Sequence, residues 1–188
     1  RQPAGAIERA RDIPTPHRGT VMLAELLLSQ FDHEMATTRA LLSRVPEASA
    51  SWKPHPKSTS LGALAQHITN LVGFGPLIIQ ETERDVNPPG GPPRVPVVFS
   101  TTSALLAHFD ANTTATRDAL ASATDEGLMV PWALKNGGAV IFSMPRAAVL
   151  RSFMISHIIH HRGQLSVYLR MLDVPLPSIY GPTADDAR

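Results

Sequence analysis

Cysteine is absent from this chain of 188 residues. Its absence excludes a disulfide framework, thiolate metal ligands and a cysteine nucleophile. Any thiol chemistry must therefore use a thiol that belongs to a substrate. The chain also lacks an uninterrupted apolar run near the ~20 residues that a membrane-spanning helix needs, and its N-terminus has no basic-then-apolar signal pattern. We therefore expect a cytoplasmic protein with no membrane partner.

An excess of one charge is missing as well. The chain has 17 Lys and Arg against 16 Asp and Glu, and the basic residues are scattered along it. Nucleic-acid binding depends on clustered positive charge, so we expect no nucleic-acid partner. The length and the 43% hydrophobic content suffice for one core. They predict a single domain over residues 17–188, after an extended, proline-containing arm over residues 1–16.

Amphipathic segments separated by Pro- and Gly-rich connections predict an all-α fold. The segments run over about residues 17–43, 60–82, 100–122 and 143–172. Each has one apolar face, and such faces are buried only by packing together, so we expect a four-helix bundle. Residues 124–142 predict either a loop or a short β-hairpin, with residues 140–142 as the best strand candidate.

Two histidines in the last predicted helix, His157 and His161, stand four residues apart. At ~100° per residue they lie about 40° apart around the helix, so both rings can reach one ion. A third, His67, lies on the apolar face of the second predicted helix. The angular positions predict that all three rings point into the core. Three neutral imidazoles are the ligand number of a catalytic zinc-type site with one open position; the alternative is a polar core cluster or a surface patch.

Two neighbours of these histidines are secondary candidates. His160 lies about 60° from His157, on the side opposite His161, which favours a contact near the site or a place at the rim of the bundle over a ligand role. Gln164 follows His161 by one turn and is predicted to face inward. Its amide is suited either to hydrogen-bond a ligand ring or a substrate, or simply to pack.

Several catalytic motifs are absent. A zincin needs His-Glu-x-x-His, but Ile158 follows His157. The Glu-x-x-His motifs of di-iron bundles do not occur, and neither does a phosphate-binding glycine loop or a Gly-x-Ser-x-Gly elbow. A single Lewis-acidic metal ion is the chemistry that remains.

Short motifs along nearly the whole chain carry a family resemblance. They are Trp52-Lys-Pro54, the Ser-Leu-Gly-Ala-Leu-Ala-Gln-His of residues 60–67, His157-x3-His161-Arg-Gly-Gln164, and the Val-Pro-Leu-Pro-Ser-Ile-Tyr-Gly of residues 174–181. In this order and combination they resemble the DinB/YfiT-like metalloenzymes. The resemblance implies a four-helix bundle of unusual connectivity, a homodimer, and His67, His157 and His161 as the ligands of one divalent metal ion. Zinc or nickel is the expected ion, with manganese or iron as alternatives.

The same resemblance implies an activity. Characterised relatives use the metal to activate a low-molecular-weight thiol such as bacillithiol or mycothiol, so we expect an S-transferase acting on a small electrophile. Gln164 and Tyr168 are the candidate catalytic residues that would orient the substrate, although core packing is the alternative for Tyr168. Three further aromatic residues are candidates for the mouth of the site or for anchoring loops: Trp52, Trp132 and Tyr180.

Two other functions stay open. One is hydrolysis by a metal-activated water, for which Asp32 and Glu34 are candidate bases only if they turn inward. The other is a binding protein with a structural or sensory ion and no turnover. An open coordination position favours either enzyme, and a closed four-ligand site favours the binding protein.

Overall fold

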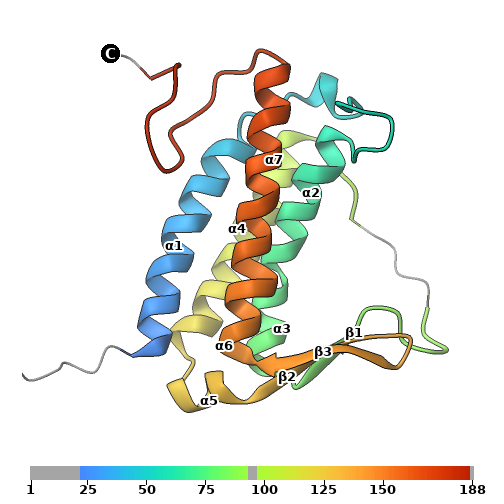
Figure 1. Cartoon of the computed structure of the whole chain (residues 1–188), viewed down its shortest axis with the longest axis vertical. Helices are drawn as coiled ribbons and strands as arrows, with labels where there is room; N and C mark the ends of the chain where they lie inside the picture. The colour runs from blue at the N-terminus through green and yellow to red at the C-terminus, as the bar shows by residue number, and fades with distance from the viewer. Residues whose placement is uncertain (1–21, 93–96, 187–188) are drawn as a thin grey trace, which may run out of the picture.

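Long helices lying side by side dominate the computed structural model, which describes residues 22–92 and 97–186 (Figure 1). The helices are α1 (Leu23–Leu42), α2 (Leu61–Val72), α3 (Phe74–Gln80), α4 (Thr102–Ala121) and α7 (His157–Met171). α1 and α2 each pack against α4 and α7, and α3 packs against α4. The mainly helical fold is confirmed, whereas the arm predicted over residues 1–16 lies outside the described residues.

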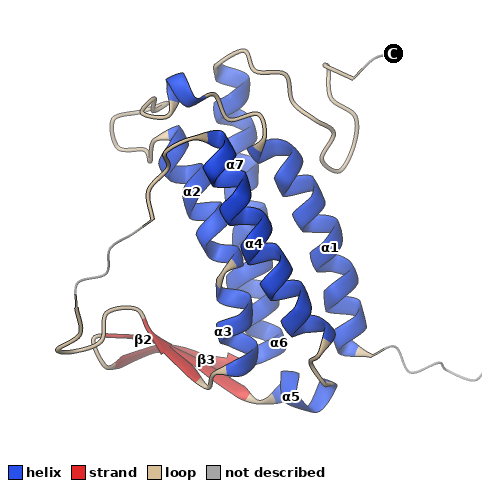
Figure 2. Ribbon diagram, turned by 180° about the vertical axis from the view of Figure 1, so that it is seen from behind, coloured by secondary structure: helices blue, strands red, loops and turns tan. Residues whose placement is uncertain are grey.

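A small sheet makes the all-α prediction partly wrong. β1 (Glu83–Asp85), β2 (Pro131–Asn136) and β3 (Ala139–Pro145) pair in the order β1-β2-β3, at one end of the molecule near α3 and α6 (Arg146–Val149) (Figure 2). β2 and β3 form an antiparallel hairpin, as one alternative for residues 124–142 predicted, and the two glycines of its turn have positive φ angles of 61° and 83°. The sequence did not predict β1, because this strand is only three residues long and has no alternation of apolar and polar residues.

The hairpin is preceded by α5 (Asp125–Met129), a short helix that the sequence analysis also missed. A three-residue helical turn, η1 (Glu47–Ser49), lies between α1 and α2. Capping explains where some helices begin: the Thr101 hydroxyl accepts a hydrogen bond from the Ala104 amide at 3.1 Å at the start of α4. Ser60 occupies the same position before α2, but its side chain makes no capping bond.

The second predicted helix is divided at Gly73, between α2 and α3. Pro76 has no N–H, so the carbonyl of Val72 loses its ordinary helical partner. The Thr116 hydroxyl of α4 donates to that carbonyl at 2.8 Å, and the Asn112 amide donates to the Thr69 carbonyl at 3.0 Å. The backbone groups released by the break are therefore satisfied from α4.

The last predicted helix has three parts. α6 (Arg146–Val149) is followed by η2 (Leu150–Ser156), a π-helical segment, and then by α7. β3 extends to Pro145, so the helix begins later than predicted. A π-helical turn is uncommon and often lies at a functional site, and here it ends one residue before His157.

One helical stretch, Leu61–Gln80, is long and apolar enough to satisfy the length and hydropathy criteria for a membrane span. However, 56% of its most apolar window is buried inside the fold. This burial is typical of a core helix in a globular domain. Ile68 of this stretch is fully buried, and so are Phe31 and Trp132 of the core that it joins.

Candidate metal centre

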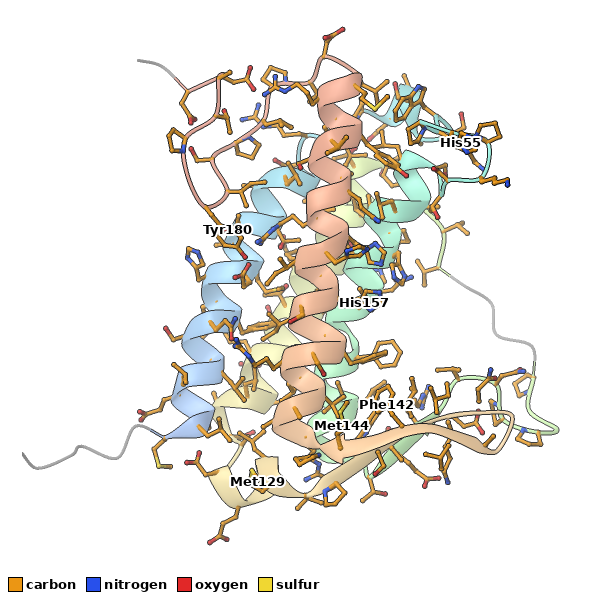
Figure 3. All side chains as sticks on the ribbon, in the orientation of Figure 1. His55, Met129, Phe142, Met144, His157 and Tyr180 are labelled. Atoms are coloured by element: carbon orange, nitrogen blue, oxygen red, sulfur yellow. The ribbon has the colours of Figure 1, made fainter. Side chains whose placement is uncertain are left out.

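Three histidine rings converge between α2 and α7. His67 comes from α2, and its ring centroid lies 5.3 Å from that of His157 and 4.6 Å from that of His161. The His157 and His161 centroids are 4.6 Å apart, and Figure 3 shows His157 on the side of α7 toward α2. One ring nitrogen from each lies within 4.8 Å of the others, and within the part of the chain that the structure describes this is the one such group of potential metal ligands. The structure thus brings together the residues that the sequence singled out.

Their depth differs from the prediction. His67 is exposed, and His157 and His161 are half-buried. The prediction that the three rings point into the core is therefore wrong. The core side of α2 is occupied instead by residues such as Ile68 and Leu64. Helical periodicity gives the direction of a side chain around its own axis, but not how far the neighbouring helices cover it. The result is a site that solvent and small molecules can reach.

The amide of Gln164 joins two of the neighbouring rings. Its Oε1 lies 2.8 Å from Nδ1 of His161, and its Nε2 lies 3.1 Å from Nε2 of His160. Because an amide oxygen only accepts, Nδ1 of His161 carries the proton and Nε2 keeps the lone pair that an ion needs. Gln164 was predicted to face inward, but it is exposed. Its predicted hydrogen bond to a candidate ligand ring is present. His160 contacts this amide and stays outside the group of three.

Electrostatics favour the neutral form of His157. Partial burial lowers its pKa from the ordinary value of 6.5, and the charge of His161 lowers it further. A hydrogen bond to the Phe153 backbone opposes the shift, and His160 adds to it. A metal ion binds only the deprotonated imidazole, so this environment suits ligand chemistry.

The aromatic candidates take different places. Tyr168 is half-buried, and its ring packs edge-on against Trp52 with centroids 5.7 Å apart. Trp132, considered for the mouth of the site, is fully buried in the core. Tyr180 instead anchors the C-terminal segment, because its hydroxyl lies 2.8 Å from Oε1 of Glu34 on α1.

A buried ion pair on the other face of α7 was not predicted. Arg162 is 1% exposed and lies 2.7 Å from the carboxylate of Glu34, which is 5% exposed. Arg162 also donates to Tyr180 at 2.7 Å and to Thr38 at 3.2 Å. It lies about 140° around the helix from His157, and Figure 3 shows Tyr180 and His157 on opposite sides of α7. α7 is therefore covered on two faces.

This pairing bears on the acids considered for hydrolysis. The carboxylate of Glu34 is held by Arg162, on the face of α7 away from the histidines. Asp32 is engaged by Arg117 of α4 at 3.0 Å. Neither acid belongs to the histidine group. Both candidate bases thus have other partners.

His67 is also part of the wall of a pocket of about 550 Å³. α2 forms one side of it, and residues 97–99 form another. The sequence analysis missed it because the pocket depends on how the segment before α4 lies against α2. A close approach marks that contact: a Cβ atom added to Gly62 would lie 3.0 Å from the ring of Phe99.

Comparisons with known proteins agree with the motifs in the sequence. A family model described as the DinB superfamily matches residues 30–165. YrdA, an uncharacterised protein of Bacillus subtilis, is 25% identical over 159 residues, which are 85% of this chain and 89% of YrdA. Two crystal structures, a DinB-like protein from Bacillus cereus and the DinB-like YjoA from Bacillus subtilis, are each 23% identical with a TM-score of 0.62; the matches cover 82% of this chain and 95% and 96% of theirs. At that identity the two structures show the fold alone, but the family model spans most of the chain, and the chain belongs to the DinB superfamily.

Proposed function

We propose that this protein is a mononuclear metal-dependent enzyme that transfers a small thiol to an electrophile. His67, His157 and His161 are the proposed ligands, held by a four-helix bundle. The observation that carries the proposal is the convergence of three imidazoles in a chain that has no cysteine. The nucleophilic sulfur must then come from a substrate. The homodimer and the cytoplasmic location stay predictions.

The donor set fits a divalent transition-metal ion. Nitrogens bound at ~2.1 Å in a tetrahedral site lie about 3.4 Å apart, so small side-chain rotations bring rings already within 4.8 Å to that spacing. Zinc or nickel is the proposed ion, and iron or manganese is the alternative. Bound by three neutral ligands, such an ion supplies a Lewis acid that lowers the pKa of a thiol.

The chain's own residues would prepare the site. Gln164 fixes the tautomer and orientation of His161, and partial burial favours the neutral form of His157 by lowering its pKa. The exposure of His67 leaves one side open for the thiol. Tyr168 stays a candidate for orienting the substrate. In the reaction the thiol proton passes to solvent, a sulfur–carbon bond forms, and the leaving group departs from that carbon with its electron pair.

Metal-dependent hydrolysis is the weaker candidate, because Asp32 and Glu34 are both engaged in ion pairs with arginines. A general base must lie within hydrogen-bond reach of the water that it activates. A binding protein without turnover would use the same three histidines, and an activity measurement separates it from the transferase.

The test compares metal content and thiol transfer in matched variants. The wild-type protein, purified and reconstituted with zinc or nickel, should hold one equivalent of metal and consume a thiol in the presence of a chromogenic electrophile. His161→Ala should lose both properties. His160→Ala, which removes the adjacent imidazole, should keep its metal. Full metal retention in His161→Ala would contradict the ligand assignment, and metal without any thiol consumption would favour the binding protein.

A further inference from the structure

The pocket beside His67 is lined by uncharged side chains, apart from the imidazole of His67 itself. No lysine, arginine, aspartate or glutamate lines it among the described residues. Two of its apolar residues, Val97 and Val98, are 54% and 72% exposed, which is unusual for valine. Its volume of about 550 Å³ lies in the range of pockets that hold small organic molecules. Burying a charged ligand in such surroundings without a partner is unfavourable.

A buried amide supplies polarity at one side of this pocket. Gln66 lines it, is 4% exposed, and also borders a second cavity of about 230 Å³ that reaches His108. Its Nε2 donates to Oδ1 of Asn70 at 3.0 Å and lies 3.1 Å from Nδ1 of His108. These contacts use both amide protons of Gln66, so the hydrogen-bonding atom that remains is its oxygen, an acceptor. Asn70, whose oxygen is used, keeps its amide as a donor.

We propose that this pocket binds the electrophilic substrate, and that the substrate is an uncharged small molecule with an apolar body and one hydrogen-bonding group. The inference rests on the proposed function, because only the transfer reaction requires a second substrate. The apolar body would pack on Val97, Val98 and Phe99, and the polar group would meet Gln66 or Asn70. His67 belongs to both the pocket and the histidine group. A molecule held there is placed next to the position where the sulfur would react.

The first test measures the charge preference of the pocket with two probes that share one skeleton. N-phenyl-1-naphthylamine is neutral, and 1-anilinonaphthalene-8-sulfonate adds a negative charge. Both become fluorescent in an apolar site, so titration gives their dissociation constants for the metal-free and the metal-loaded protein. The neutral probe should bind at least about tenfold more tightly than the anionic probe in the metal-free protein. Equal binding, or tighter binding of the anion, would overturn the proposal.

The second test fills the pocket without touching a histidine. Ala63 lines the pocket one turn before His67 and is exposed, so Ala63→Trp should occupy the space with little effect on the core. It should weaken the neutral probe by about tenfold or more and leave metal content unchanged. Ala36→Trp, at an exposed position on α1, is the matched control and should change neither. If Ala63→Trp does not fold, Ala63→Met makes the same comparison with a smaller side chain.

If the folded Ala63 variant binds the neutral probe as tightly as the wild-type protein does, the probe binds elsewhere, and the assignment of this pocket to the electrophile is refuted. In an active protein the same variant should raise the KM for the electrophile by about tenfold and leave the KM for the thiol unchanged. Failure of the pocket and failure of the proposed function are distinguishable. Probe binding is measured without metal or turnover, whereas the function fails through absent metal or absent thiol consumption.

Discussion

The buried pair of Arg162 and Glu34 predicts a large loss of stability when it is broken from one side. In Arg162→Met the long apolar side chain still fills much of the space, but the carboxylate of Glu34 remains 2.7 Å from where the guanidinium was. Glu34 is only 5% exposed, so water cannot replace the missing charge. The Tyr180 hydroxyl, at 2.8 Å, is then the main donor left to that carboxylate.

Removing one partner of a buried ion pair costs about 3–5 kcal/mol, because the other charge stays buried and uncompensated. For a chain of this length each kcal/mol lowers Tm by about 2–4 °C, so the expected fall is roughly 6–20 °C. Urea unfolding followed by circular dichroism should show the corresponding change in the free energy of unfolding.

A matched control separates burial from charge. Arg117 makes the same type of contact with Asp32, at 3.0 Å, but the two side chains are 49% and 42% exposed. Arg117→Met should therefore cost only about 0–1 kcal/mol. A loss in Arg162→Met no larger than that of Arg117→Met would refute the reasoning. The double variant Arg162→Met/Glu34→Leu should recover much of the loss, because neither charge then remains buried.

Three further predictions concern the site and its support. Gln164→Leu should weaken zinc affinity by about 10–100-fold in a competitive titration, since it removes the hydrogen bond that orients His161; unchanged affinity would argue against that role. Because the pKa of His157 is lowered in the folded state, its contribution to the stability of the metal-free fold is full above pH 6.5 and is lost as the pH falls from there through the lower folded-state pKa; His157→Asn should reduce this slope in urea unfolding at a series of pH values. Thr116→Val should cost about 1–3 kcal/mol in unfolding, because it leaves a buried carbonyl without a donor, whereas the exposed Thr114→Val should cost little.

Local periodicity was sufficient for the long helices and for the shared side of α7 on which His157 and His161 lie. The spacing of His157 and His161 depends on one helix only, whereas the apolar stripe of α2 predicted a core-facing His67, which is exposed in the structure. Pro76 was a local signal for the break at Gly73, but the prediction of a single helix over residues 60–82 did not use it. The hairpin was foreseen as an alternative because residues 140–142 favour a strand.

Other features depend on packing between segments that are distant in the sequence. The burial of Arg162 requires that α7 contact α1 as well as α2. A single apolar stripe on α7 predicts instead that the opposite face of this helix is exposed to solvent. The exposure of His67 is set by how little of α2 its neighbours cover. The pocket depends on the contact between Phe99 and Gly62, and neither of the two segments predicts this contact by itself.

The break between α2 and α3 affects the position of α2 along its own axis relative to the neighbouring helices. The donors of Asn112 and Thr116 fix the end of α2 against α4, and His67 lies less than two turns before that end. A helix that slips by one residue along its neighbour moves about 1.5 Å, whereas a metal–ligand bond tolerates only about 0.2 Å. The height of His67 relative to His157 and His161 thus depends on α4 as well as on the direct contact of α2 with α7, although α4 contributes no residue to the group. Substitutions there can change metal affinity while leaving every candidate ligand in place.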